Sequence, residues 1–252
     1  MVLLPFVLSG VKVPPRERLM FAVDVPTIDE AKAIVTDLGD SVVFYKLGLE
    51  IFMSGRYYEL LDWMRARGKK VFADLKFFDI PQTVGSAVRQ LRGRGASFVT
   101  VHAGNDAILQ AAVEAANGQP GEPLGILAVT ILTSFSQSDV HAMGIGADVS
   151  GVVVERARRA KECGCAGVIA SGHETARLRL ECGPDLIIVN PGIRPATARP
   201  ADDQKRTVDV ETAFKSGADY IVVGRPIKSA PDRRAAAEAI QATILHTISA
   251  GR

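Results

Sequence analysis

Short apolar runs and segments of helical periodicity alternate along the whole chain. Eight apolar runs, rich in Val, Ile, Leu and Phe, have the length and composition of buried strands. They cover residues 19–25, 42–49, 71–73, 98–103, 124–132, 167–171, 186–190 and 220–223. After each run the apolar residues take the spacing of an amphipathic helix, in residues 27–38, 57–67, 81–92, 106–116, 149–163, 174–181, 208–215 and 235–248. We expect Thr27 to cap the first helix, because its hydroxyl can accept a backbone N–H.

Eight strand–helix units in succession predict one α/β domain with the (β/α)8 fold of a TIM barrel. A doubly wound parallel sheet would also alternate strands and helices. In its common dinucleotide-binding form, such a sheet carries a glycine-rich turn after the first strand, and this chain has none there. The barrel is therefore the favoured architecture.

Composition and charge narrow the class of protein. The 252 residues are 47% apolar and carry a net charge of +2, which offers no basic field for nucleic acid. The three cysteines, at 163, 165 and 182, form neither a CxxC pair nor a disulfide framework. No run approaches the ~20 apolar residues of a transmembrane helix, and the start lacks the pattern of a signal peptide. We expect a cytoplasmic protein that binds neither nucleic acid nor membrane.

The third strand ends in the most unusual segment of the chain, KVFADLKFFDIPQT at residues 70–83. Asp74 and Lys76 are two residues apart, so on a regular strand their side chains share one face. Asp79 follows the strand, and Pro81 suits the first turn of a helix. Burying a carboxylate beside an ammonium group is costly unless the two are paired. The spacing alone leaves open a structural ion pair and a functional one.

Other polar residues also fall at or near the ends of the predicted strands. They are Asp24, Lys46, Thr133, Arg194 and Arg225, in addition to Asp74 and Lys76. In a TIM barrel the carboxyl ends of the strands form one rim, where the active site lies. The Gly224-Arg225 pair follows the eighth strand, a frequent position for phosphate binding, and the loop from residue 194 to 204 could cover a ligand. So many polar side chains on one rim favour a functional site.

The string Asp74-x-Lys76-x-x-Asp79-Ile80-Pro81-x-Thr83 resembles the orotidine 5′-monophosphate decarboxylase family. The resemblance extends to Asp24, Lys46, the Pro-Gly-Ile-Arg turn at 191–194 and Gly224-Arg225. It runs from Arg18 onward, which implies an N-terminal extension at 1–17 and a catalytic barrel at 18–252. The resemblance implies that this chain removes CO₂ from orotidine 5′-monophosphate and gives uridine 5′-monophosphate without a cofactor.

The resemblance also implies roles for individual residues. Lys76 is expected to protonate C6 of the pyrimidine, with Asp74 beside the departing carboxylate and Lys46 and Asp79 completing an alternating charged array. Asp24 is expected to hold the ribose and Thr133 the pyrimidine. The phosphate end is assigned to Arg194, Gln204, Gly224 and Arg225.

Three of these residues imply a partner chain. By the resemblance, Asp79, Ile80 and Thr83 reach the active site of a neighbouring subunit. The expected assembly is a homodimer with shared active sites.

Two other functions remain open from the residues. Related barrels with an Asp-x-Lys-x-x-Asp string include metal-dependent sugar-phosphate lyases and aldolases, although Lys46 and the Ile80-Pro81-x-Thr83 continuation favour the decarboxylase. No His, Asp or Glu cluster has metal-ligand spacing. A nucleotide-binding protein without activity would not need the complete set of charged strand-end residues.

Overall fold

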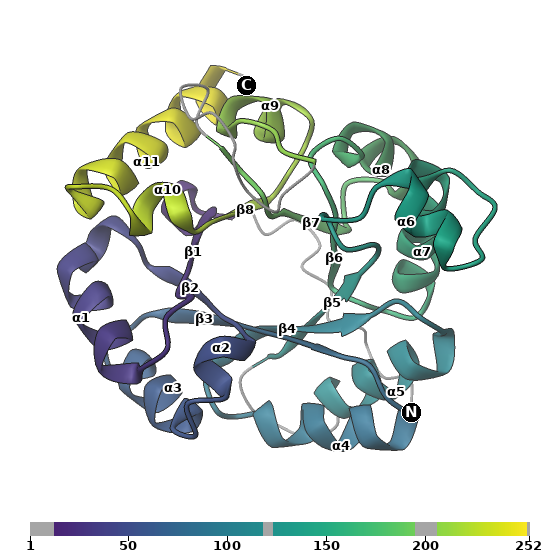
Figure 1. Cartoon of the computed structure of the whole chain (residues 1–252), viewed down its shortest axis with the longest axis horizontal. Helices are drawn as coiled ribbons and strands as arrows, with labels where there is room; N and C mark the ends of the chain where they lie inside the picture. The colour runs from purple at the N-terminus through teal and green to yellow at the C-terminus, as the bar shows by residue number, and fades with distance from the viewer. Residues whose placement is uncertain (1–12, 118–122, 195–205, 251–252) are drawn as a thin grey trace.

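The computed structural model describes residues 13–117, 123–194 and 206–250. Eight parallel strands pair in chain order, and β8 pairs with β1 to close the barrel. Figure 1 shows the strands as an inner ring and the helices as an outer one. The structure thus confirms the predicted (β/α)8 fold.

The elements alternate as the apolar pattern predicts. The strands are β1 Leu19–Ala22, β2 Phe44–Leu47, β3 Lys70–Phe77, β4 Ala96–His102, β5 Gly125–Val129, β6 Gly167–Ile169, β7 Ile187–Asn190 and β8 Tyr220–Val223. The principal helices are α1 Ile28–Leu38, α3 Tyr57–Arg65, α4 Pro81–Leu91, α5 Asp106–Asn117, α7 Val149–Glu162, α8 Thr175–Cys182, α9 Val210–Lys215 and α11 Arg233–Ala250. Shorter elements are η1 Pro15–Glu17, η2 Gly39–Ser41, α2 Leu49–Phe52, α6 Gln137–Ala142 and α10 Arg225–Lys228.

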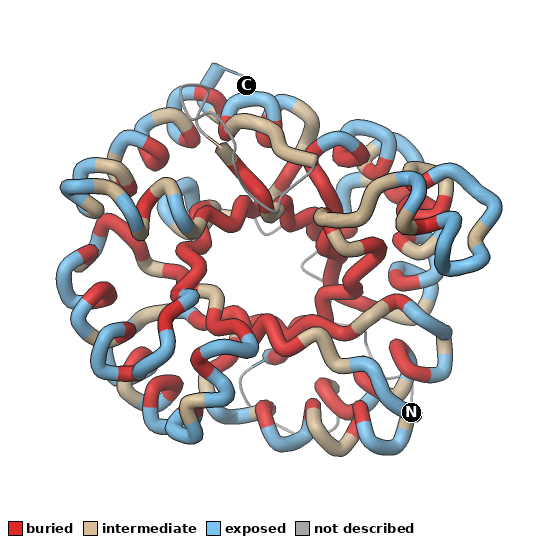
Figure 2. The backbone as a smooth tube through the Cα atoms, in the orientation of Figure 1, coloured by how far each residue is buried: buried red, intermediate tan, exposed pale blue. Residues whose placement is uncertain are grey.

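The two faces of the strands pack in two apolar layers. One layer lies between the strands and the helices, and the other fills the barrel interior. In the interior, the rings of Phe44, Phe98 and Tyr220 lie within 5.8 Å of one another, measured between centroids. They come from β2, β4 and β8, and layers built from alternate strands are typical of such barrels. Figure 2 shows the buried ring of strands and the exposed outer faces of the helices.

Local capping agrees with the sequence at the first helix, because the Thr27 hydroxyl accepts the backbone N–H of Glu30 at 3.2 Å. Other boundaries differ. The apolar runs at 42–49 and 124–132 predict strands that are too long, and Leu49 lies in α2 instead of β2. The short helices α2, α6 and α10 were not predicted, because four to six residues are too few to show a helical period.

The beginning of the described chain packs against the barrel. Arg16 forms an ion pair with Glu238 of α11 at 2.7 Å, and Glu17 pairs with Lys70 of β3 at 2.6 Å. Val13 packs against the interior cluster. Residues 13–17 of the predicted N-terminal extension therefore contact the barrel, while residues 1–12 lie outside the described part. No helix in the described part combines the length and apolar composition needed to cross a membrane.

Arg179 of α8 joins helix and strands at the amino-terminal end of the barrel. Its side chain makes six hydrogen bonds, to the carbonyl oxygens of Gly183, Pro184, Leu186 and Gly217 (twice) and to the Asp219 carboxylate. The same Asp219 oxygen accepts the Ile188 N–H at 2.9 Å. One guanidinium group therefore fixes the entries to β7 and β8.

We predict that Arg179→Ala lowers the free energy of unfolding by about 2–4 kcal/mol, because it leaves several half-buried acceptors unpaired. Urea unfolding followed by circular dichroism measures this change. Arg177→Ala on the same helix is the control, since Arg177 is exposed and makes one hydrogen bond, to Ser150. Equal losses for the two variants would contradict the assignment.

Candidate active site

A cavity of about 260 Å³ opens at the carboxyl ends of the strands. Its wall contains most of the rim residues predicted from the sequence: Asp24, Lys46, Asp74, Lys76, Thr133, Arg194, Gly224 and Arg225. Apolar side chains from the barrel interior, including Phe72 and Val129, form its floor. The barrel thus brings together residues that lie 200 positions apart in the chain.

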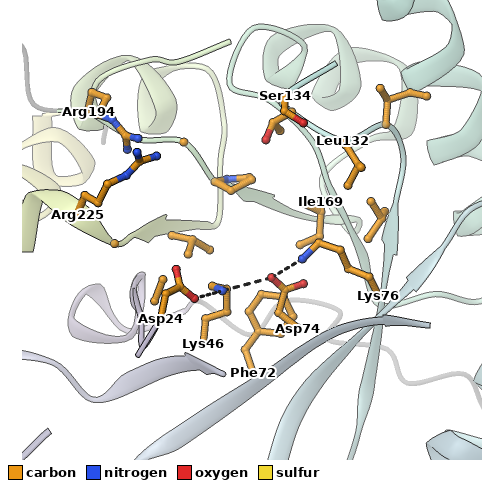
Figure 3. A pocket seen from close by; sticks show the side chains of 18 residues that line it. Asp24, Lys46, Phe72, Asp74, Lys76, Leu132, Ser134, Ile169, Arg194 and Arg225 are labelled. Atoms are coloured by element: carbon orange, nitrogen blue, oxygen red, sulfur yellow. Dashed lines mark hydrogen bonds and ion pairs between the residues drawn. The ribbon is translucent and has the colours of Figure 1, made fainter. Parts of the chain in front are cut away.

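Four charged side chains form an alternating array along one side of the cavity. Lys46 Nζ lies 3.0 Å from Asp24 Oδ1 and 3.5 Å from Asp74 Oδ2. Lys76 Nζ lies 2.8 Å from the same Asp74 oxygen. Figure 3 shows the array running from Asp24 through Lys46 and Asp74 to Lys76. Negative and positive groups thus alternate across three neighbouring strands.

The inner pair of this array is largely removed from water, with 11% of the Asp74 side chain and 12% of the Lys46 side chain exposed. Burial by itself raises the pKa of Asp74, but the charges of Lys46 and Lys76 and hydrogen bonds from Lys76 and Thr100 lower it below its usual value. Burial likewise lowers the pKa of Lys46, and the two carboxylates outweigh it and raise that pKa. Both groups are therefore charged at neutral pH.

The backbone is irregular where Asp74 and Lys76 lie. Ala73 pairs with Val99 and Phe77 with Val101, so residues 74, 75 and 76 of β3 stand opposite the single residue Thr100 of β4. Lys76 has φ of +49°, the one non-glycine residue with positive φ in the described ranges. The expected convergence of Asp74 and Lys76 is correct, but the simple strand alternation used to predict it is wrong. A bulge re-aims the lysine.

Thr100 is a site residue that the sequence analysis missed. Its hydroxyl oxygen accepts the backbone N–H of Lys76 at 2.8 Å and donates to Asp74 Oδ1 at 3.0 Å. The side chain is fully buried. In the sequence, Thr100 stands out as a hydroxyl residue within the apolar run FVTVHA. That pattern does not show which residue on another strand it contacts.

Two arginines occupy the opposite side of the cavity. The guanidinium groups of Arg194 and Arg225 point toward each other, across the cavity from Lys76 (Figure 3). Arg194 is held by its backbone, whose N–H donates to the Val208 carbonyl at 3.0 Å. Arg225 is separated from the end of β8 by Gly224 and begins α10. Gln204, assigned to the same end by the resemblance, lies outside the described residues.

A buried ion pair supports the loop beside Thr133. Arg206 Nη1 lies 2.6 Å from Glu174 Oε1, and Arg206 Nη2 donates to the Leu132 carbonyl at 3.4 Å. Burial raises the pKa of Glu174. The pair connects the segment after β6 with the cavity wall after β5. The sequence analysis missed it as well, because its two members are 32 residues apart.

The three residues that the resemblance assigns to a neighbouring subunit do not line the cavity of their own chain. Asp79 accepts the backbone N–H of Ile80 at 2.6 Å. Ile80 is 65% exposed, and Thr83 lies exposed on α4. Among the described residues, no group of three or more His, Cys, Asp or Glu side chains is arranged to hold a metal ion.

Comparison with known proteins gives consistent matches over most of the chain. The model of the "Orotidine 5'-phosphate decarboxylase / HUMPS family" matches residues 17–240. A protein of Methylococcus capsulatus named orotidine 5′-phosphate decarboxylase is 53% identical over 248 residues, which cover 98% of this chain and 100% of the relative. A protein of the same name from Xanthomonas axonopodis pv. citri is 53% identical and covers 90% of this chain and 92% of its own.

Solved structures agree with these matches. The crystal structure of orotidine 5′-phosphate decarboxylase from Lactobacillus acidophilus superposes with a TM-score of 0.80 at 34% identity, covering 90% of this chain and 99% of that one. The enzyme of that name from Pyrococcus horikoshii gives 0.70 at 26% identity, with the same coverage.

The lowered pKa of Asp74 predicts a pH-dependent contribution to stability. Because the pKa is lower in the folded than in the unfolded chain, the contribution is complete above the unfolded value of about 4 and disappears as pH falls through the folded pKa. We predict that Asp74→Asn costs about 1.5–3 kcal/mol of unfolding free energy at pH 7, the range for hydrogen bonds to charged groups. The difference from wild type should shrink below pH 4.

Urea unfolding at pH 7 and pH 3 measures this difference, with Asp185→Asn as the control because Asp185 is exposed. A gap that stays constant with pH would show that the ionised carboxylate does not stabilise the fold.

Proposed function

The chain belongs to the orotidine 5′-phosphate decarboxylase / HUMPS family, and we infer that it converts orotidine 5′-monophosphate to uridine 5′-monophosphate and CO₂ in pyrimidine biosynthesis. One observation carries this inference from the residues. A cavity with an ordered Lys–Asp–Lys array on one side and two arginines on the other fits a substrate with two anionic ends. Orotidine 5′-monophosphate has a carboxylate on its ring and a phosphate on its ribose.

The reaction needs a cation at the position where negative charge develops. The bond between C6 and the carboxylate breaks, the electron pair stays on C6, and CO₂ leaves as a neutral molecule. Lys76 would stabilise the pair on C6 and donate an ammonium proton to it, after which its amine regains a proton from water. In this proposal Asp74 holds the Lys76 ammonium in place through the 2.8 Å ion pair, so that the cation is oriented before the bond breaks.

The remaining wall residues would bind the parts of the substrate that do not react. Asp24, paired with Lys46, would hold the ribose, and Thr133 would contact the pyrimidine. The phosphate would lie between Arg194 and Arg225 beside Gly224, because a guanidinium fork matches phosphate oxygens. The family resemblance adds Gln204 to this end. Binding energy from the phosphate can then support positioning at C6.

The alternative of a metal-dependent sugar-phosphate lyase or aldolase finds no support among these relatives. Relatives from Methylococcus and Xanthomonas, 51–53% identical to this chain, carry the decarboxylase name. A nucleotide-binding protein without activity would have no use for the Lys46–Asp74–Lys76 array, which is costly to bury.

The proposal includes a homodimer with shared active sites. Large apolar side chains are exposed on two segments of the rim: Leu49 and Met53 are 54% and 77% exposed in and after α2, and Phe78 and Ile80 are 66% and 65% exposed after β3. A second copy of the chain would cover them. It would also receive Asp79, which lies outside its own chain's cavity and would complete the charged array next to Lys46 of the neighbour.

We predict that Lys76→Ala lowers kcat by at least about 10³-fold, because it removes both the cation and the proton donor. The loss of orotidine 5′-monophosphate absorbance measures turnover. Lys70→Ala is the matched control, since Lys70 lies at the opposite end of β3 and pairs with Glu17. A folded Lys76→Ala variant that keeps more than about a tenth of wild-type kcat, a loss of only ~1.4 kcal/mol, would refute the assignment.

We also predict that two inactive variants, Lys76→Ala and Asp79→Ala, complement each other when their subunits exchange. A mixed dimer would contain one site with both defects and one site with neither. Random exchange makes about half of the dimers mixed, so activity should approach about a quarter of the wild-type value per subunit.

The control mixes Lys76→Ala with Asp74→Ala. Both residues belong to one chain's site, so no activity should return. If the Asp79 mixture also stays inactive after exchange has been demonstrated, Asp79 does not act across an interface.

A further inference from the structure

We propose that Thr100 is a positioning residue of this active site, because its hydroxyl holds the Lys76 backbone and the Asp74 carboxylate in one arrangement. The inference rests on the proposed decarboxylation, in which Lys76 must be placed at C6. Thr100 does not line the cavity. Its effect on the reaction must therefore pass through its two hydrogen-bonded neighbours.

The first step of the argument is the bulge in β3. Residues 74 to 76 of β3 stand opposite the single residue Thr100 of β4. In this stretch, β4 therefore has fewer backbone carbonyl groups than β3 has N–H groups to pair with them. A half-buried N–H without an acceptor is destabilising. At Lys76 the Thr100 hydroxyl takes the place of the missing carbonyl, at 2.8 Å. A side chain thus satisfies the backbone at the point where the strand departs from regular pairing.

The second step is the conformation of Lys76. A φ of +49° is unfavourable for any residue with a Cβ, and it persists only where the surroundings fix it. The hydrogen bond to Thr100 is the interaction that the Lys76 N–H makes in this conformation. Without it, the backbone gains freedom to return toward ordinary strand angles, which would turn the lysine side chain away from its present direction.

The third step is the direction of the hydroxyl bond to Asp74. A hydroxyl has one hydrogen, and an ionised carboxylate can only accept. Thr100 therefore accepts from the Lys76 N–H and donates to Asp74 Oδ1, which leaves Oδ2 for the ammonium groups of Lys46 and Lys76. The fully buried Thr100 side chain therefore acts on Lys76 in two ways. It accepts the hydrogen bond from the Lys76 backbone, and it holds the Asp74 carboxylate that pairs with the Lys76 ammonium group.

Three variants separate this role from simple support of the fold. Thr100→Val keeps the shape but can neither accept nor donate, whereas Thr100→Ser keeps the hydroxyl. Thr130→Val is the matched control, because Thr130 is also fully buried, just after β5, and its hydroxyl donates to the Ile169 carbonyl at 2.9 Å without touching the charged array.

We expect Thr100→Val to lower kcat by about 10- to 100-fold with KM changed less than about threefold, because misplacement of a reacting group acts on the chemical step. Thr100→Ser should keep kcat within about threefold of wild type, and Thr130→Val should lose melting temperature but little kcat. If Thr100→Val does not fold, Thr100→Ala replaces it, since Ala and Ser both lack the methyl group and differ only in the hydroxyl.

The proposal is overturned if the hydroxyl-free variants match Thr100→Ser in kcat, or if Thr130→Val loses as much kcat as Thr100→Val. Wild type serves as the reference for the function itself: an inactive wild type refutes the decarboxylation. Hydrogen exchange of the Lys76 backbone amide then tests Thr100 without turnover. That amide should be protected in wild type and Thr100→Ser and exchange faster in Thr100→Val; equal exchange rates would refute the positioning role.

Discussion

The site depends on one buried carboxylate that has to remain charged. Asp74 is shielded from water, and an ionised carboxylate in such a place is stable only if cations and hydrogen-bond donors surround it. Lys46 comes from β2, Lys76 from β3 and Thr100 from β4. These three strand ends lie side by side because β3 pairs with β2 on one side and with β4 on the other. The two apolar layers that pack against the strands therefore stabilise the site, because they fix the positions of the strand ends.

In the proposed reaction, the two ends of the cavity would have different roles. In the proposed reaction, the alternating charges at one end would present a fixed ammonium group to the reacting carbon. At the other end Arg194 and Arg225 offer a strong attraction for a group that does not react. In this proposal, an anion bound there would place the rest of the molecule against Lys76, so that remote binding energy would become orientation at the reacting bond.

The barrel and most of the rim could be predicted from the sequence, because both follow from local patterns in short stretches of the chain. Apolar runs show strands, and polar residues that end them must share a rim once parallel strands close. The bulge at 74–76 could not be predicted, since it is defined by pairing with β4. Thr100 was missed for the same reason, and so was the ion pair of Glu174 with Arg206. Contacts between distant segments leave no trace in local periodicity.

The central claim is that the residues of the chain itself supply the cation and the proton for decarboxylation. It is tested most directly by incubating protein dialysed against EDTA with orotidine 5′-monophosphate and measuring uridine 5′-monophosphate and CO₂ together. The account predicts one CO₂ for each uridine 5′-monophosphate, at the rate of undialysed protein. Activity that EDTA abolishes and a divalent metal restores, or a substrate that yields no uridine 5′-monophosphate, would contradict it.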